Sequence, residues 1–178
     1  MPLLYTAEEA RKLVLAAKFP PQGVRGFGSP FAPERFHPSL GAGEYLEQAN
    51  EALLTMVQIE TKEAVENVDE IAAVPGIDVL FVGPFDLGNN IGHPIVNGKM
   101  HVDLHAAIAK VLKATTAAGK KAGIFCTSGE QAKGYADQGF HMISVATDMS
   151  ILPAAVLNAV NTAKGLDQGP QLTGPYGK

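Results

Sequence analysis

The chain has 178 residues, 46% hydrophobic and 18% charged, so its length and composition are those of a folded globular domain and not of a disordered protein. The net charge of −4 argues against nucleic acid as a partner, and no apolar run is long enough to span a membrane. A single cysteine, Cys126, excludes an internal disulfide framework and favours a reducing compartment. Because the N-terminus resembles neither a signal peptide nor a transit peptide, we expect a cytoplasmic protein.

Apolar residues and turn residues alternate along the chain in a pattern that predicts helices and strands in turn. Thr6 and Glu9 form a capping-box pattern before the first helix, and Ser128 and Gln131 repeat that pattern later. The predicted helices cover 7–18, 44–53, 62–73, 102–118, 128–138 and 149–164. The predicted strands cover 54–60, 79–83, 121–126 and 142–146. Long irregular segments are expected at 19–43 and 84–101.

The alternation of strands with helices predicts an α/β fold with a parallel sheet. The sheet could be an open doubly wound sheet or part of a (β/α)8 barrel, and the absence of a glycine-rich dinucleotide fingerprint argues against a Rossmann domain. Only four strands are predicted, whereas a closed barrel has eight. Residues 1–4 resemble the end of a strand. We therefore expect further strands to precede this chain in the complete fold.

Two acidic residues follow predicted strands, Glu60 after the first and Asp86 three residues after the second. Carboxyl ends of parallel strands meet at one rim of the sheet, where active groups gather. Gln58 lies two residues before Glu60 and therefore faces the same side of the strand. Two carboxylates with amide and water oxygens suit Mg²⁺ or Mn²⁺. Taken singly, each acid could also be an N-cap or a first-turn carboxylate that the helix dipole favours.

Other reactive side chains give weaker signals. His93, between Gly92 and Pro94, could be a base or a ligand, although a loop histidine is more often exposed or hydrogen-bonded. The same holds for the other loop and helix histidines, and no pair of them has the spacing of a zinc site. No activating base is evident for Cys126, so a buried core thiol is expected. Arg25 and Arg35 could bind a carboxylate but are more often solvated loop charges.

Three stretches resemble the HpcH/HpaI aldolase/citrate lyase family of metal-dependent pyruvate aldolases. They are TAEEARKLVLAAKFPPQGVRGFG, YLEQANEALLTMVQIETKEAVENVDEIAAVPGIDVLFVGPFDLG and GKKAGIFCTSGEQAKGYADQGFHMISVATDMSIL. The resemblance covers 1–164 and implies a (β/α)8 TIM barrel, of which this chain is about the C-terminal half, roughly strands five to eight. We expect 165–178 to be a disordered tail.

The resemblance also assigns roles to the residues at the strand ends. It implies that Glu60 and Asp86 bind Mg²⁺, or alternatively Mn²⁺ or Co²⁺, and that Gln58 supports the site. The carboxylate of pyruvate would lie against the backbone of Gly83, Pro84 and Phe85. Pyruvate would chelate the cation and form an enolate. That enolate would attack an aldehyde, or would arise when a 4-hydroxy-2-oxo acid is cleaved.

The resemblance implies a class II (metal-dependent) aldolase, a carbon–carbon lyase that acts on pyruvate or another 2-oxo acid and an aldehyde. The family's catalytic histidine and substrate-binding arginine would lie upstream, and His37 and Arg25 are not their counterparts, so we expect impaired activity. One alternative is a non-catalytic half barrel or pseudoenzyme subunit that oligomerises. Another is an oxaloacetate decarboxylase of the macrophomate synthase type. Family members are commonly hexamers that exchange the last helix, which predicts a homo-oligomer here.

Overall fold

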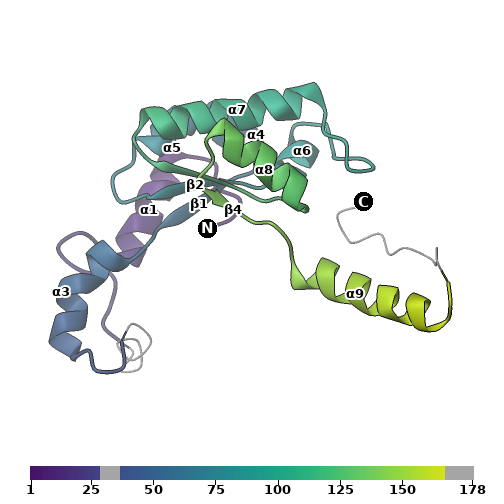
Figure 1. Ribbon diagram of the computed structural model, residues 1–178. Helices are drawn as coiled ribbons and strands as arrows, with labels where there is room; N and C mark the ends of the chain where they lie inside the picture. The colour runs from purple at the N-terminus through teal and green to yellow at the C-terminus, as the bar shows by residue number, and fades with distance from the viewer. Residues whose placement is uncertain (29–36, 167–178) are drawn as a thin grey trace.

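The computed structural model describes residues 1–28 and 37–166, which form a parallel sheet and its surrounding helices (Figure 1). The predicted tail therefore lies outside the described residues from 167 onward, as does part of the predicted loop at 19–43. The strands are β1 (Met56–Ile59), β2 (Val79–Val82), β3 (Lys121–Ile124) and β4 (Met142–Ile143). The helices are α1 (Ala7–Ala17), α3 (Ala42–Ala52), α4 (Lys62–Glu66), α5 (Val68–Ala72), α6 (Pro84–Asn90), α7 (Val102–Ala117), α8 (Gly129–Gln138) and α9 (Asp148–Ala163).

The four strands are parallel and lie in the order in which they occur in the chain, β1-β2-β3-β4. Ile59 pairs with Val82, and Val82 pairs with Ile124, so the first three strands end level with one another. A doubly wound sheet would reverse its strand order at a switch point. The sequential order instead agrees with part of a barrel, which confirms that prediction and makes the doubly wound alternative wrong for the described strands.

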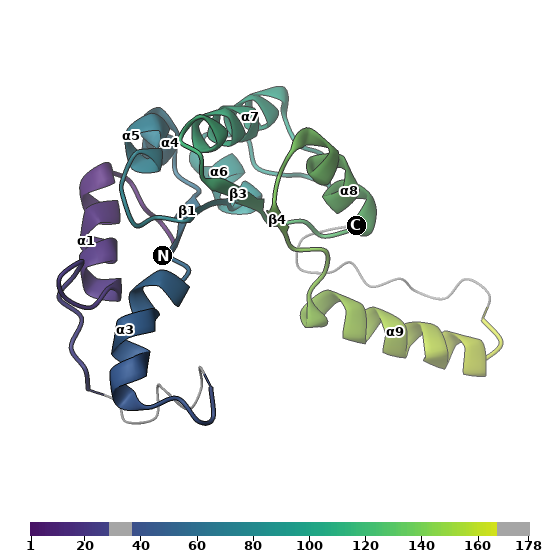
Figure 2. The ribbon, with the colours of Figure 1, turned by 60° about the vertical axis from the view of Figure 1, so that its left-hand side comes forward.

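Helices cover one face of this sheet, where α1, α5, α4, α7 and α8 form an arc (Figure 2). Alternate strand residues are completely buried in the core cluster that these helices share, and the residues between them, such as Gln58 and Phe81, are half-buried. The strand residues that alternate in this way are Val57, Ile59, Leu80, Val82, Ala122 and Ile124, while Val79 and Gly123 are buried as well. Such alternation is expected where only one face of each strand packs against helices. The other face is not covered by these helices, so its side chains can form a site.

Side-chain caps fix the start of several helices, as the sequence predicted. Thr6 Oγ1 accepts a hydrogen bond from the backbone N–H of Glu9, and the Glu9 carboxylate accepts one from the N–H of Thr6. Ser128 Oγ accepts from the N–H of Gln131, but the Gln131 side chain accepts from Thr127 instead of Ser128. The second capping box is therefore only half formed, although α8 still begins where it was predicted.

The strand predicted over 142–146 is shorter in the structure, where β4 covers only Met142–Ile143. Two further segments differ in kind. The helix predicted over 62–73 is divided into α4 and α5 at Asn67, whose side-chain amide donates to the carbonyl oxygen of Tyr5. The irregular segment predicted over 84–101 begins with a helix, α6. Pro84 suggested a break, but proline fits the first turn of a helix, where its missing N–H has no intrahelical partner to lose.

Helix α9 extends away from the sheet, and none of its residues is buried (Figure 1). Its exposed apolar side chains are Met149, Ile151, Leu152, Val156 and Val160. None of the helices in the described part of the chain has the length and hydrophobicity needed to cross a membrane.

The buried thiol of Cys126 yields a test of this packing. Its side chain is fully buried, which confirms the sequence prediction, and burial raises the pKa of Cys126 to about 11. At about pH 8 very little thiolate is present, and access is blocked as well. We predict that a thiol reagent such as DTNB modifies the native chain at least about 100-fold more slowly than the urea-unfolded chain. Equal rates in the two states would contradict the burial.

Candidate functional site

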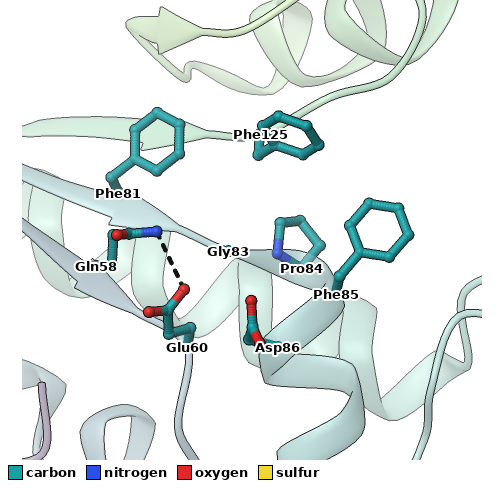
Figure 3. Close-up of a pocket in the computed structure, with 8 residues that line it drawn as sticks. All are labelled: Gln58, Glu60, Phe81, Gly83, Pro84, Phe85, Asp86 and Phe125. Atoms are coloured by element: carbon teal, nitrogen blue, oxygen red, sulfur yellow. Dashed lines mark hydrogen bonds between the residues drawn. The ribbon is translucent and has the colours of Figure 1, made fainter. Parts of the chain in front are cut away.

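A cavity of about 150 Å³ opens on the helix-free face of the sheet, at the carboxyl ends of the strands (Figure 3). The residues that line it are Gln58, Glu60, Phe81, Gly83, Pro84, Phe85, Asp86 and Phe125. They come from β1, from β2 with the start of α6, and from the residue after β3. Carboxyl ends of parallel strands are where such folds carry their active groups. The position of the cavity makes it the candidate site.

Glu60 is the most constrained polar side chain in the cavity. It follows β1 directly and is only 3% exposed. One carboxylate oxygen, Oε1, accepts a hydrogen bond of 2.7 Å from the backbone N–H of Leu3. The other, Oε2, accepts one of 3.1 Å from Nε2 of Gln58 (Figure 3). Because each oxygen has its own donor, the carboxylate has a defined orientation in the cavity wall.

Asp86 supplies the second carboxylate. It is exposed and lies in the first turn of α6, where the helix dipole favours a negative charge. Its side chain points toward the same side of the cavity as that of Glu60 (Figure 3). The first-turn interpretation therefore fits the position of Asp86. The N-cap interpretation does not fit Glu60, because Thr61 caps α4.

The two acids influence each other electrostatically. Burial raises the pKa of Glu60, the Leu3 N–H bond lowers that pKa, the negative charge of Asp86 raises it, and the N-terminal ammonium lowers it. The net effect is a pKa above the ordinary value of 4.5. Water-poor surroundings and a neighbouring anion both disfavour the charged carboxylate. A cation placed in the cavity would offset both effects.

Gly83 allows the Glu60 side chain to lie directly against the end of β2. A Cβ atom added at Gly83 would be 2.3 Å from Glu60 Oε2 and 3.3 Å from Glu60 Cβ. Gly123 plays a similar part on β3, where an added Cβ would be 2.5 Å from the Phe81 ring. Both glycines therefore leave space that a cavity side chain fills.

Six predicted residues line this one cavity: Gln58, Glu60, Gly83, Pro84, Phe85 and Asp86. Their individual roles stay predictions. The other candidates lie elsewhere. Arg25 stacks on the Phe19 ring, the exposed His37 accepts a hydrogen bond from Ser39, and Arg35 is outside the described residues.

Sequence reasoning missed Phe81, Phe125 and the Leu3 N–H. Phe81 could have been found, since it lies two residues before Gly83 and so faces the same side of β2. Phe125 likewise follows the end of a strand. Leu3 carries no such signal, because its contact with Glu60 joins residues 57 positions apart.

Replacing Gly83 with alanine tests the close packing around Glu60. The added methyl group would displace the carboxylate or the strand end, so we predict that Gly83→Ala lowers the free energy of unfolding by about 1–3 kcal/mol in urea titrations. Gly134→Ala is the matched control, because its added Cβ has no heavy atom within 4 Å and helix α8 should gain about 0.8–1 kcal/mol. Equal stability of the two variants would contradict this account.

Replacing Glu60 with glutamine tests the cost of the buried charge. The raised pKa means that the folded chain binds a proton more tightly than the unfolded chain, so wild-type stability falls as pH rises from about 4.5 through the folded pKa. We predict that, in EDTA, the stability of Glu60→Gln relative to wild type increases over the same range. Urea unfolding between about pH 4 and pH 8 measures this. Parallel curves would refute it, and Glu51→Gln, at an exposed site on α3, is the control.

Comparisons with known proteins show which family the chain resembles. Residues 1–155 match the model of the HpcH/HpaI aldolase/citrate lyase family. The hydroxypyruvate/pyruvate aldolase of Chromohalobacter salexigens is 42% identical over 93% of this chain and 63% of its own length. That of Rhizorhabdus wittichii is 40% identical over 93% of this chain and 64% of its own length. The chain thus spans less than two thirds of the length of these relatives.

Solved structures give the same picture. An HpcH/HpaI aldolase/citrate lyase family protein from Burkholderia cenocepacia J2315 superposes with a TM-score of 0.80 at 34% identity, covering 92% of this chain and 63% of the other. Macrophomate synthase superposes with a TM-score of 0.76 at 29% identity, covering 91% and 56%. The family match and the shared fold confirm the resemblance predicted from the sequence, and the chain belongs to the HpcH/HpaI aldolase/citrate lyase family.

Proposed function

We propose that the chain carries the cation-binding part of the active site of an aldolase that acts on 2-oxo acids. The observation that carries this proposal is the buried carboxylate of Glu60, which lies beside Asp86 in a cavity at the strand ends. Burying a charge without a partner is costly, and such charges are normally paired or bound to a metal. The membership of the chain in an aldolase and lyase family agrees with this chemistry.

The residues present fit a hard divalent cation. Glu60 and Asp86 offer carboxylate oxygens to the same space, and the side-chain amide nitrogen of Gln58 points to Glu60 at its edge (Figure 3). Mg²⁺ usually takes one or two carboxylates and keeps several waters, and Mn²⁺ accepts the same oxygen ligands. We propose Mg²⁺, with Mn²⁺ or Co²⁺ as alternatives. When bound, such a cation would polarise the keto group of the substrate and stabilise the negative charge that develops on its oxygen.

The surrounding residues would orient the carboxylate ligands and the substrate. Gln58 donates to Glu60 Oε2 and so would hold Oε1 and Oε2 in one orientation as the site fills. The backbone of Gly83, Pro84 and Phe85 would receive the substrate carboxylate. Pro84 has no N–H, so its own contribution would be the turn that opens α6, whose N-terminal end carries partial positive charge.

The substrate class follows from what related proteins have in common. Relatives of 42% and 38% identity are a hydroxypyruvate/pyruvate aldolase and a 4-hydroxy-2-oxo-heptane-1,7-dioate aldolase, respectively. Both names contain a 2-oxo acid. We therefore propose that the substrates are pyruvate or another 2-oxo acid and an aldehyde. The bond that forms or breaks would join the carbon next to the keto group to the carbon that bears the hydroxyl group. The likeness to macrophomate synthase makes oxaloacetate decarboxylation a second candidate reaction.

Proton transfer is the part of the reaction that this cavity supports least. None of the eight described residues that line it is a histidine, lysine or arginine. A positioned general acid or base typically contributes about 10²–10⁴-fold to a rate. Typical enzymatic kcat values are about 1–10³ s⁻¹. We therefore propose that this chain turns over about 10²–10⁴-fold more slowly than that.

We further propose a cytoplasmic homo-oligomer. Helix α9 buries none of its residues in the described part of the chain, although Ile151, Leu152 and Val156 are apolar. Apolar residues on one helix are normally covered by a partner. A second copy of the chain would provide that cover.

A binding assay separates the cation site from the proposed slow turnover. We predict that calorimetric titration detects pyruvate binding only when Mn²⁺ is present. Glu60→Gln and Asp86→Asn should each weaken Mn²⁺ binding, measured by water-proton relaxation, about tenfold or more. Cleavage of 4-hydroxy-2-oxo acids, coupled to pyruvate reduction, should be about 10²–10⁴-fold slower than in typical enzymes.

The control is Asp137→Asn, which changes an exposed aspartate on α8 that pairs with Lys133 and should leave Mn²⁺ binding unaltered. If pyruvate bound as tightly in EDTA as with Mn²⁺, this would contradict the proposed cation site. Cleavage at normal enzymatic rates would instead show that proton transfer does not depend on groups outside the described cavity.

A further inference from the structure

A second group of metal-binding side chains lies in the connection between α6 and α7, and its members do not line the cavity of Figure 3. His93 follows α6, His101 is the N-cap of α7, and Asp103 lies in the first turn of that helix. Their side chains are 36%, 48% and 61% exposed. Solvent, and therefore a dissolved ion, can reach all three.

The ligand atoms converge. Asp103 Oδ2 is 3.0 Å from His93 Nε2 and 3.3 Å from His101 Nδ1, and one ligand atom from each residue lies within 4.8 Å of the others. Zn²⁺ binds imidazole nitrogen and carboxylate oxygen at about 2.0–2.2 Å in tetrahedral geometry, which places two ligand atoms about 3.3–3.5 Å apart. The separations from Asp103 Oδ2 are close to that value.

Both histidines of this cluster approach the same carboxylate oxygen. His101 Nδ1 accepts a hydrogen bond of 3.2 Å from the backbone N–H of Asp103. The same nitrogen lies 3.3 Å from Asp103 Oδ2, and His93 Nε2 approaches that oxygen as well. A cation bound here could take a nitrogen ligand from each ring and an oxygen ligand from Asp103.

The rings must turn for both nitrogens to point at one ion. The two imidazoles are stacked, with centroids 3.9 Å apart and planes 8° apart, so their in-plane lone pairs run nearly parallel. Both rings are on the surface, and rotation about their terminal side-chain bonds has broad minima. The ion would replace the cap hydrogen bond at His101 and the stacking contact with direct bonds.

We propose that His93, His101 and Asp103 form a Zn²⁺ site, with water completing the coordination. Two imidazoles and one carboxylate suit borderline metals such as Zn²⁺, Ni²⁺ and Cu²⁺, whereas the all-oxygen pair in the cavity suits Mg²⁺. The bound ion would fasten the connection that follows α6 to the first turn of α7, so its role is structural. The site does not depend on the proposed aldolase chemistry.

The test uses the tag-free chain carrying Glu60→Gln, with excess Mg²⁺, so that the cavity does not contribute. We expect calorimetric titration to give one Zn²⁺ per chain and Zn²⁺ to raise the melting temperature, since it binds the folded state. His93→Gln and Asp103→Asn should each lower the Zn²⁺ affinity by about tenfold or more. With Cu²⁺ in place of Zn²⁺, the electron paramagnetic resonance spectrum should show coupling to two nitrogens, and to one in His93→Gln.

The matched control is His105→Gln, which removes an exposed histidine from the same helix without touching the cluster. It should bind Zn²⁺ as tightly as the parent. Unchanged Zn²⁺ affinity in both His93→Gln and Asp103→Asn, or an equal loss in His105→Gln, would overturn the proposal. Because these side chains are exposed, the variants should fold, and circular dichroism of each checks this.

Discussion

The carboxylate of Glu60 is held almost out of water, and the surrounding fold is arranged around this buried charge. Its two oxygens receive hydrogen bonds from Leu3 and Gln58, the end of β2 carries a glycine to make room for it, and Asp86 adds a second negative charge. A core that needed only stability would place an apolar side chain there, because burying a charge opposes folding. The arrangement is therefore better explained by function than by stability.

One face of the sheet stabilises the fold, and the other forms the cavity. Residues such as Ile59 and Val82 pack under the helices and stabilise the fold, while Gln58, Phe81 and Gly83 point to the opposite face and form the cavity. Since successive strand residues face opposite sides, one short strand can serve both purposes. The parallel register then brings the ends of neighbouring strands level, which is what places Glu60 beside the turn that carries Asp86.

The sequence predicted most of the fold and six of the eight residues that line the cavity. Strand periodicity and strand ends located Gln58, Glu60 and Asp86, because those signals extend over only a few residues. The contact of Leu3 with Glu60 joins residues 57 positions apart, so no local spacing predicts it. His93 and His101 stack across an irregular segment between α6 and α7, where no helical or strand period applies. The helix at Pro84 was missed for another reason, since the same residue suits both a turn and a first helical turn.

The central claim is that Glu60 and Asp86 share one hard divalent cation. Crystals grown with Mn²⁺ and measured at a wavelength where manganese scatters anomalously test it most directly. We predict one anomalous peak in the cavity, about 2.0–2.3 Å from an oxygen of each carboxylate, with water at the other positions. Well-ordered crystals with no peak there, or with a peak bound by neither acid, would contradict the account.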